Sequence, residues 1–137
     1  MAYSSKQQLQ AFISNDAITD FLDDDGDGTE DPGLLDAIIA ACSVEADGFV
    51  SSIYPVPFSD PAPSKIRAAT TVFVCEAFYA RRLTPDQANP FRQRADMWRQ
   101  ILKEIGTGDV PLDESYIRGF EPGFAVTVPL AVNKTTM

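Results

Sequence analysis

The 137-residue chain has the length of a single domain, and its 45% hydrophobic content is typical of a chain that folds around a core. No run approaches the roughly eighteen apolar residues of a membrane span, and the first residues lack the charged start and apolar run of a secretory leader, so no membrane association is expected. The net charge of −9 disfavours tight nucleic-acid binding, which requires a dominant basic surface.

The charges are distributed unevenly along the chain. Residues 1–60 contain twelve acidic side chains and a single basic one, Lys6. Residues 65–103 reverse this, with eight basic and three acidic side chains. Such polarity would let the acidic end of one subunit pair with the basic end of a neighbour in a homo-oligomer. The alternative is two solvated faces with no partner.

Two short helices are predicted at the start of the chain. Ser4 or Ser5, followed three residues later by a glutamine, gives a capping-box pattern that opens a helix through about Ile13. A second short helix is predicted over residues 16–22. A glycine-punctuated acidic loop follows over residues 23–31, where regular helix is not expected.

The clearest periodic signal predicts one long amphipathic helix. Asp31 and Pro32 are typical of an N-cap followed by a proline at the first helical position. Apolar residues then recur at steps of three and four, up to a predicted end near Ser52. The members of this stripe are Leu35, Ile38, Ile39, Cys42, Ala46, Phe49, Val50 and Ile53.

A proline-rich connector separates this helix from the next. Four prolines make residues 54–63 a stiff, extended segment that cannot be helical. Ser64 is predicted to cap a helix over about residues 65–82. Because this helix is apolar nearly all round, we expect it to be the central buried one.

A last helix completes the predicted helical domain. Thr84 and Pro85 indicate a helix start, and Pro90 a kink or a restart. The apolar stripe that follows ends at Gly106 and Gly108. Four to five helices against almost no strand signal predict an all-α bundle over residues 1–108.

Residues 109–137 are predicted to form an extended, β-prone arm. Apolar residues alternate strictly from Phe124, which is a strand pattern, and no second strand in the chain obviously pairs with it. Pro129 restricts such a strand to an edge. We favour an arm that binds another subunit, like or unlike, over a flexible tail. The predicted partner-binding residues are Phe124, Val126, Val128, Leu130 and Val132.

One motif indicates metal chemistry. The segment DDDGDGTED, residues 23–31, fits the front half of a calcium-binding loop, whose alternate carboxylates converge on one hard cation. The twelfth loop position is Leu34 instead of the usual bidentate glutamate, so Asp36 would have to substitute in part. A structural Ca²⁺ is our interpretation, and an acidic turn without metal is the alternative. The predicted ligands are Asp23, Asp25, Asp27, Thr29 (through its carbonyl), Asp31 and Asp36.

The sequence gives little support for catalysis. It contains no histidine, the commonest general base, and no glycine-rich loop that would cradle a phosphate. Cys42 and Cys75 have no basic neighbour in sequence that would activate a thiolate, so we expect two buried free thiols. The chain is therefore predicted not to be an enzyme.

Four segments, taken in order, resemble a known family. A short helix with Gln-Gln-Leu and the acidic loop come first, followed by LLDAIIAACSVEADGFVSSIYPVPF. A helix ending in FYARRLTPD and a closing helix RQRADMWRQILKEIGTG come next. Over roughly residues 3–112 the chain resembles the Mu-like phage structural proteins, which are grouped with the head–tail connector or adaptor proteins of long-tailed phages.

The resemblance implies a small helical subunit of a ring of about twelve copies beneath the portal. Such a ring would extend the DNA channel, bind the portal and the neck, stopper or tail proteins, and let DNA pass without specific binding. It would lie at the neck of the virion, after assembly in the host cytoplasm. A calcium-stabilised helical interaction module without a viral role is the alternative, and a metal-dependent enzyme using the aspartate loop is a second one.

Overall fold

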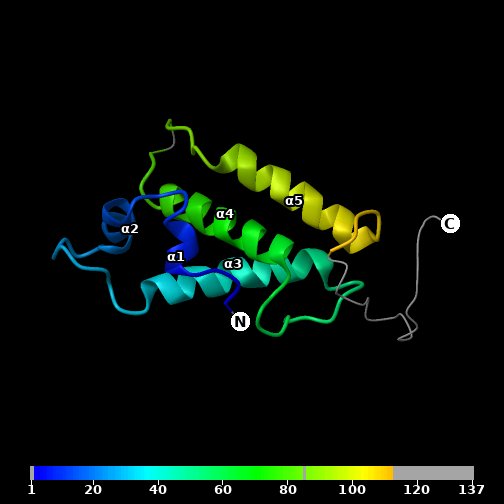
Figure 1. Ribbon diagram of the computed structural model, residues 1–137. Coiled ribbons are helices and arrows are strands. Elements are labelled where there is room, and N and C mark those ends of the chain that lie inside the picture. The colour runs from blue at the N-terminus through cyan, green and yellow to red at the C-terminus, as the bar shows by residue number, and fades with distance from the viewer. Residues whose placement is uncertain (1, 85, 113–137) are drawn as a thin grey trace.

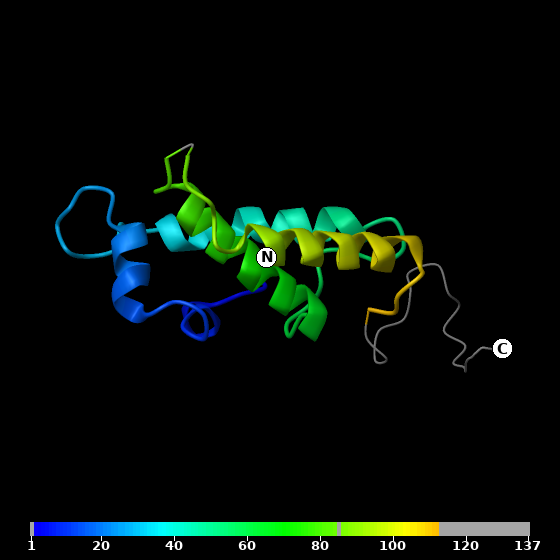
Figure 2. The ribbon, with the colours of Figure 1, turned by 90° about the horizontal axis from the view of Figure 1, so that it is seen from above.

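The computed structural model describes residues 2–84 and 86–112, and the predicted arm residues 124–132 lie outside this part. The described residues form helices and loops without a strand, so the all-α prediction is confirmed (Figure 1). Three long helices pack on one another, and the two short helices both contact the second of the three long ones (Figure 2). In chain order they are α1 (Lys6–Leu9), α2 (Asn15–Leu22), α3 (Leu34–Val50), α4 (Ser64–Ala80) and α5 (Arg92–Thr107).

Serine side chains begin both short helices. The Ser5 hydroxyl accepts a hydrogen bond from the backbone N–H of Gln8, as the capping-box pattern predicts. The hydroxyl of Ser14 does the same for Ala17 at the start of α2. The prediction that the first helix reaches Ile13 is wrong, because the backbone must become extended at Ser14 to cap α2.

The start of α3 differs from the prediction. Asp31 is not its N-cap, because the Asp31 carboxylate accepts a hydrogen bond from the N–H of Asp24 across the acidic loop. Gly33 precedes the helix instead, with a φ of 77° that only glycine adopts readily. The helix ends at Val50, two residues before the predicted end.

The central position of α4 is confirmed. Pro63 is its N-cap, and Ser64 is already helical and makes no capping hydrogen bond, so the predicted serine cap is wrong. Proline fits there because its fixed φ holds the chain extended while its carbonyl accepts the first helical hydrogen bond, from Arg67. The largest side chains of α4 that are completely shielded from solvent are Phe73, Phe78, Ile66, Val74 and Thr70.

The last helix begins later than its first start signal. The Gln87 side chain accepts a hydrogen bond from the N–H of Thr84, yet this segment forms a turn, and α5 starts at Arg92. Asn89 explains the difference, since its side chain bonds both the N–H of Phe91 and the carbonyl of Glu76 and so holds a loop. The predicted restart after Pro90 is confirmed.

Gly106 lies inside α5, whereas Gly108 ends the helix with a φ of 91°. A Cβ atom on Gly106 would lie 2.0 Å from the carbonyl oxygen of Phe49 in α3. The Ser52 hydroxyl donates a hydrogen bond of 2.8 Å to the carbonyl of Gly106 at the same place. The two helices therefore approach each other backbone to backbone, which only a glycine permits.

The N-terminal segment is fastened to the bundle through Tyr3. Its hydroxyl donates to the carboxylate of Asp47 at 2.7 Å and accepts from the N–H of Phe58 at 2.8 Å, while its own N–H donates to the hydroxyl of Ser43. The proline-rich connector is non-helical, as predicted, but it is more than a spacer because Phe58 and Tyr54 are buried in the core.

The described residues that follow α5 lie against the same body. Leu112 is buried, and its N–H donates to the hydroxyl of Tyr54 at 3.4 Å. The carbonyl of Pro111 accepts a hydrogen bond from the ammonium group of Lys65, at the start of α4. Pro111 and Leu112 therefore lie at the end of the bundle where α4 begins and α5 ends.

Candidate metal centre

The connection between α2 and α3, residues 23–33, contains the acidic loop and projects at one end of the bundle (Figures 1 and 2). Asp23 organises its first half, because the Asp23 carboxylate accepts hydrogen bonds from three backbone N–H groups: Gly26 at 2.8 Å, Asp27 at 3.1 Å and Gly28 at 2.8 Å. Gly26 and Gly28 both have positive φ angles, of 77° and 84°. The glycines thus let the backbone wrap around one carboxylate.

The other carboxylates of the loop are oriented by similar bonds. The Asp25 carboxylate accepts from the N–H of Asp27 at 3.2 Å. The Asp27 carboxylate accepts from both the N–H and the hydroxyl of Thr29, each at 2.9 Å. Asp31 closes the loop through its bond from the N–H of Asp24. Each side chain is therefore held in one direction by the backbone.

Four carboxylates converge in this arrangement. Asp23, Asp25, Asp27 and Asp31 each offer one oxygen, and these oxygens all lie within 4.8 Å of one another. All four residues are exposed or half-buried, so the cluster is accessible from solvent. Carboxylate oxygens are the ligands that hard divalent cations prefer, so the donor set could hold such an ion.

The other two predicted ligands are not among these carboxylates, and the predicted role of the Thr29 carbonyl stays a prediction. Asp36 lies in the first turn of α3 and is not among the converging carboxylates. The side chain and N–H of Thr29 both contact Asp27, where they orient a carboxylate of the cluster. The sequence spacing therefore identified the four converging aspartates, whereas the substitution of Asp36 for a bidentate glutamate is not supported by the geometry.

The crowding of these carboxylates affects their protonation. A hydrogen bond with Asp23 raises the pKa of Asp25, and the negative charges of Asp27 and Asp31 raise it further. The pKa of Asp27 is lowered instead, because the N–H and the hydroxyl of Thr29 stabilise its ionised form. The hydrogen bonds of these two neighbouring carboxylates therefore shift their pKa values in opposite directions.

Two arginines at the end of α4 anchor the loop, and the sequence did not predict this role. Arg81 and Arg82 bind the Asp24 carboxylate at 2.5 Å and 2.9 Å. Both also donate to the carbonyl of Phe21, at the C-terminus of α2, where positive charge is favourable. Desolvation opposes the effect, but the two guanidinium groups together lower the pKa of Asp24. The only sequence feature that could have indicated this anchor is the pair of adjacent arginines, which lies far along the chain from the aspartates of the acidic loop.

Further ion pairs show that the charge polarity along the sequence is partly neutralised within the fold. Glu76, a nearly buried residue of α4, binds Arg99 at 2.5 Å and Arg92 at 2.7 Å. Arg99 also binds Glu45 of α3 at 2.8 Å, and Lys6 binds Glu30 of the acidic loop. The pair of Glu45 with Arg99, like the pairs of Asp24 with Arg81 and Arg82, therefore joins an acid of the first half to bases of the second half of the same chain.

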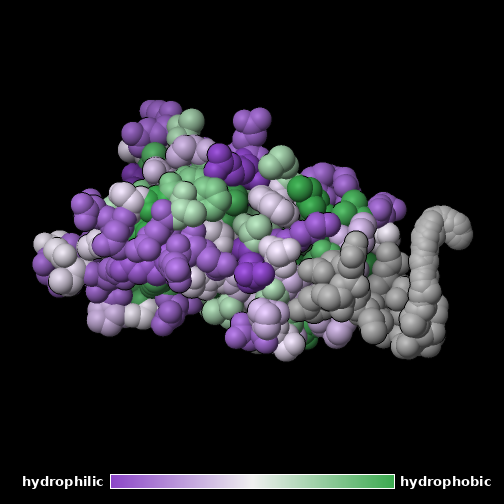
Figure 3. All heavy atoms as spheres, in the orientation of Figure 1, coloured by the Kyte–Doolittle hydropathy of each residue, from purple (hydrophilic) through white to green (hydrophobic). Residues whose placement is uncertain are grey.

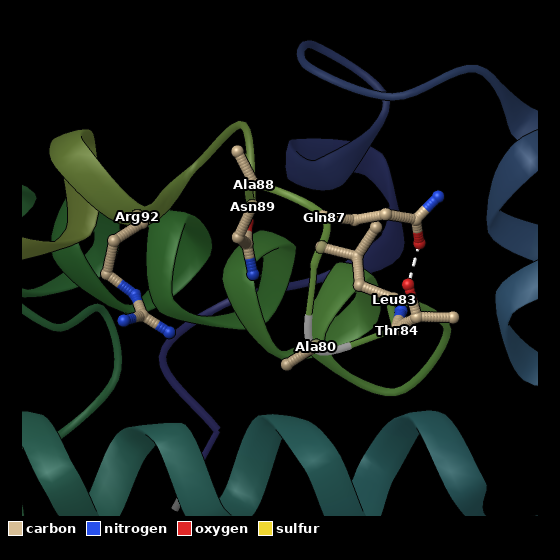
Figure 4. A pocket seen from close by; sticks show the side chains of 7 residues that line it. All are labelled: Ala80, Leu83, Thr84, Gln87, Ala88, Asn89 and Arg92. Carbon is tan, nitrogen blue, oxygen red and sulfur yellow. Dashed lines mark hydrogen bonds between the residues drawn. The ribbon is translucent and has the colours of Figure 1, made fainter.

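The two cysteines and a hollow at the end of α4 offer little reactive chemistry. Burial raises the pKa of Cys42 and Cys75 to about 12, so neither thiol is a ready nucleophile. A cavity of about 540 Å³ lies between the end of α4 and the loop before α5 (Figure 4). Asn89, Gln87 and Arg92 are its larger polar side chains, and each already makes a hydrogen bond within the fold.

One family model matches this chain: the model described as Bacteriophage Mu, Gp36 matches residues 3–116. The chain belongs to this family. The Gp36 match covers all five helices and the acidic loop, as the resemblance over residues 3–112 suggested, and the segment 124–132 lies beyond it. No curated protein matches the sequence. Among the described residues, no helix is long and apolar enough to cross a bilayer.

Proposed function

We propose that this phage protein is a structural subunit of the head–tail connector, present as a ring of about twelve copies under the portal. The ring would extend the DNA channel, bind the portal on one side and neck, stopper or tail proteins on the other, and lie in the neck of the virion. The observation that carries the proposal is the Gp36 family match across the whole helical body. No catalytic activity is expected of it.

The packing of the helices supports a mechanical role. The contact at Gly106 brings α3 and α5 together, and Glu76, Arg99 and Glu45 tie all three long helices by ion pairs. The Tyr3 hydrogen bonds add the N-terminal segment and the connector to this unit. A body fastened at so many points suits a subunit that must hold its shape under load.

The predicted C-terminal arm supplies the contacts that such a subunit needs. Its alternating residues from Phe124 to Val132 are more apolar than an isolated tail requires. In this proposal the arm binds a neighbouring subunit, and the fastened helical body gives the ring its wall.

The acidic loop is proposed to hold one structural Ca²⁺. Three oxygens of a DxDxD motif and the oxygen of Asp31 lie together, and the hydrogen bonds around Asp23 already give the loop a closed shape. A bound ion would relieve the repulsion of the four carboxylates and fix the entry to α3. The arginine anchor at Asp24 would then hold the loaded loop against α4.

The connector role is tested in the phage that encodes the chain. A stop codon in the gene should yield filled heads and free tails that fail to join, and complementation with the wild-type gene should restore joined particles in electron micrographs. Complementation with a chain that lacks residues 120–137 should fail to join particles while the helical body remains folded. Joined particles that lack the protein altogether would overturn the proposal.

The calcium site is tested by titration calorimetry. The wild type should bind one Ca²⁺, and Asp27→Asn should abolish most of the binding heat because it removes one of the converging carboxylates. Asp36→Asn is the matched control, since Asp36 is an aspartate of the same region outside the cluster, and it should bind as the wild type does. Equal heats from all three proteins would remove the site.

The alternative function, a calcium-stabilised interaction module without a viral role, is distinguished by the same protein preparations. A module should respond to Ca²⁺ with a large conformational change, measured by near-UV circular dichroism, and should not enter phage particles. A structural ion in a connector should change the melting temperature but leave the folded spectrum nearly unchanged.

A further inference from the structure

An exposed apolar strip lies at the start of α5. Among the described residues only three large hydrophobic side chains are more than a third exposed: Phe12 at 45%, Met97 at 54% and Val44 at 66%. Two of them flank Arg94, whose guanidinium carbon lies 5.5 Å from the centre of the Phe12 ring and 5.6 Å from that of Phe91. We define the α5 strip as Phe12, Pro90, Arg94 and Met97.

The strip contains a shallow hollow. A cavity of about 660 Å³ opens there, and its walls come from Pro90 and the first two turns of α5. Its lining residues are Pro90, Gln93, Arg94, Asp96 and Met97. Figure 3 shows hydrophilic residues gathered over α2 and the acidic loop, whereas hydrophobic residues reach the surface along the side formed by α4 and α5. The strip therefore presents the exposed apolar side chain of Met97 beside an open hollow.

The charge of the strip also indicates its ligand. Arg92 and Arg99 of α5 are bound to Glu76, but Arg94 makes no ion pair with any described residue, and its guanidinium group lies near the rings of Phe12 and Phe91. Its charge is available to an acidic chain. The segment that precedes the apolar arm, residues 113–123, contains Asp113, Glu114 and Glu121 against one base, Arg118.

We propose that the α5 strip binds residues 124–132 from a neighbouring copy of this chain. The apolar side of the arm would fill the hollow, and the acidic residues before it would approach Arg94. This inference rests on the proposed function, since it names the surface through which the connector subunits join.

The layout of the chain lets one copy donate its arm to the next. The hydrogen bonds at Pro111 and Leu112 fix the start of the arm at the C-terminal end of α5, whereas the strip lies at its N-terminal end. The sixteen residues of α5 separate these ends by about 24 Å. Residues 113–123 span at most about 36 Å, which is enough to reach the strip of the same chain or that of an adjacent subunit, so the intermolecular cross-link below separates the two. With donor and acceptor at opposite ends, each copy gives one arm and receives one, which is the head-to-tail arrangement of a ring.

Cross-linking between two differently tagged full-length chains tests the proposal. One chain carries Met97→Cys and the other Val128→Cys, and a flexible bis-maleimide is added to a concentrated mixture. The natural cysteines do not interfere, because both are buried. We expect at least about ten-fold more adduct between the two chains than with Val44→Cys in place of Met97→Cys, because the contact raises the local concentration of the arm. Val44 is an exposed apolar residue of α3 outside the strip.

Three results would overturn the inference. The first is no adduct, and the second is an amount equal to that of the Val44→Cys control. The third is an adduct that forms only within one chain when Met97→Cys and Val128→Cys are combined in it, because the arm then binds its own body. The stop-codon experiment tests the connector role alone. If it supports that role and the cross-link is absent, only the contact between the arm and the α5 strip is refuted.

Discussion

Replacing Gly106 by alanine should destabilise the protein, although alanine is the better helix former. Gly106 is buried in α5, and a Cβ atom there would lie 2.0 Å from the Phe49 carbonyl oxygen, where distances under 3.0 Å essentially never occur. Because the obstructing atom belongs to the backbone of α3, it cannot rotate away. The two helices must separate locally by at least about 1 Å, the difference between these two distances.

The size of the effect follows from three contributions. Overpacking a close contact costs about 1–3 kcal/mol of unfolding free energy. Separating the helices also weakens the hydrogen bond from the Ser52 hydroxyl to the Gly106 carbonyl, worth about 1 kcal/mol. The higher helix propensity of alanine offsets about 1 kcal/mol. The free energy of unfolding should therefore fall by about 1–3 kcal/mol.

Urea denaturation followed by far-UV circular dichroism measures this change, and Gly48→Ala is the matched control. Gly48 also lies in a long helix, but a Cβ atom there has open space around it. Its replacement should raise the free energy of unfolding by about 0.5–1 kcal/mol through propensity alone. If Gly106→Ala is as stable as Gly48→Ala, the close approach of α3 and α5 is refuted.

Three further predictions concern buried polar groups. Glu76→Ala should lower the free energy of unfolding, measured by urea denaturation, by about 2–3 kcal/mol because it leaves Arg99 without its main partner. Glu45→Ala, at the more exposed end of that network, should lower it by under about 1 kcal/mol. Equal losses would contradict the burial of the network. Burial raises the pKa of Asp47 above 3.8, so the folded state binds this proton more tightly than the unfolded chain does. The protonated carboxyl therefore adds to the free energy of unfolding at low pH, and this addition is lost as the pH rises through the folded pKa. Wild type should thus lose stability relative to Asp47→Asn on going from acid to neutral pH, and a constant difference would speak against it. Cys42 and Cys75 should react with a chromogenic thiol reagent only after unfolding, and rapid labelling of the folded protein would show that the thiols are not buried.

Local sequence signals predicted most of the helices. The three- and four-residue periodicity of α3 and the nearly uniform apolar character of α4 are visible without any tertiary contact. Ser5 and Gly108 also act where a local rule places them. These predictions succeeded because hydrophobic periodicity and capping are properties of neighbouring residues.

The predicted start of α3 and the first predicted start of α5 were wrong because a residue outside the predicted helix binds a side chain or backbone group that the local rule assigns to the helix start. Asp31 has the right position for a helix cap, but the acidic loop uses its carboxylate at Asp24. Thr84 and Pro85 form a local start signal, but the Asn89 side chain donates to the Glu76 carbonyl and keeps the chain in a loop. A single sequence carries no indication of which of these contacts prevails.

The candidate metal site was predictable in part, because its central motif is a pattern of neighbouring residues. The alternation of Asp23, Asp25 and Asp27 is local, and the turn around them follows from the glycines. The anchoring of the loop by Arg81 and Arg82 joins residues almost sixty positions apart, so the spacing within the motif could not indicate it. The residues beyond 112 lie outside the described part of the chain, and the predicted arm stays a prediction.

The hydrogen bonds of Tyr3 have a consequence for synthesis on the ribosome. Tyr3 leaves the exit tunnel before its partners Ser43, Asp47 and Phe58, which are made 40 to 55 residues later. The segment around Tyr3 can therefore dock between α3 and the connector only after both have emerged. This segment is translated before its partners and reaches its final position after them.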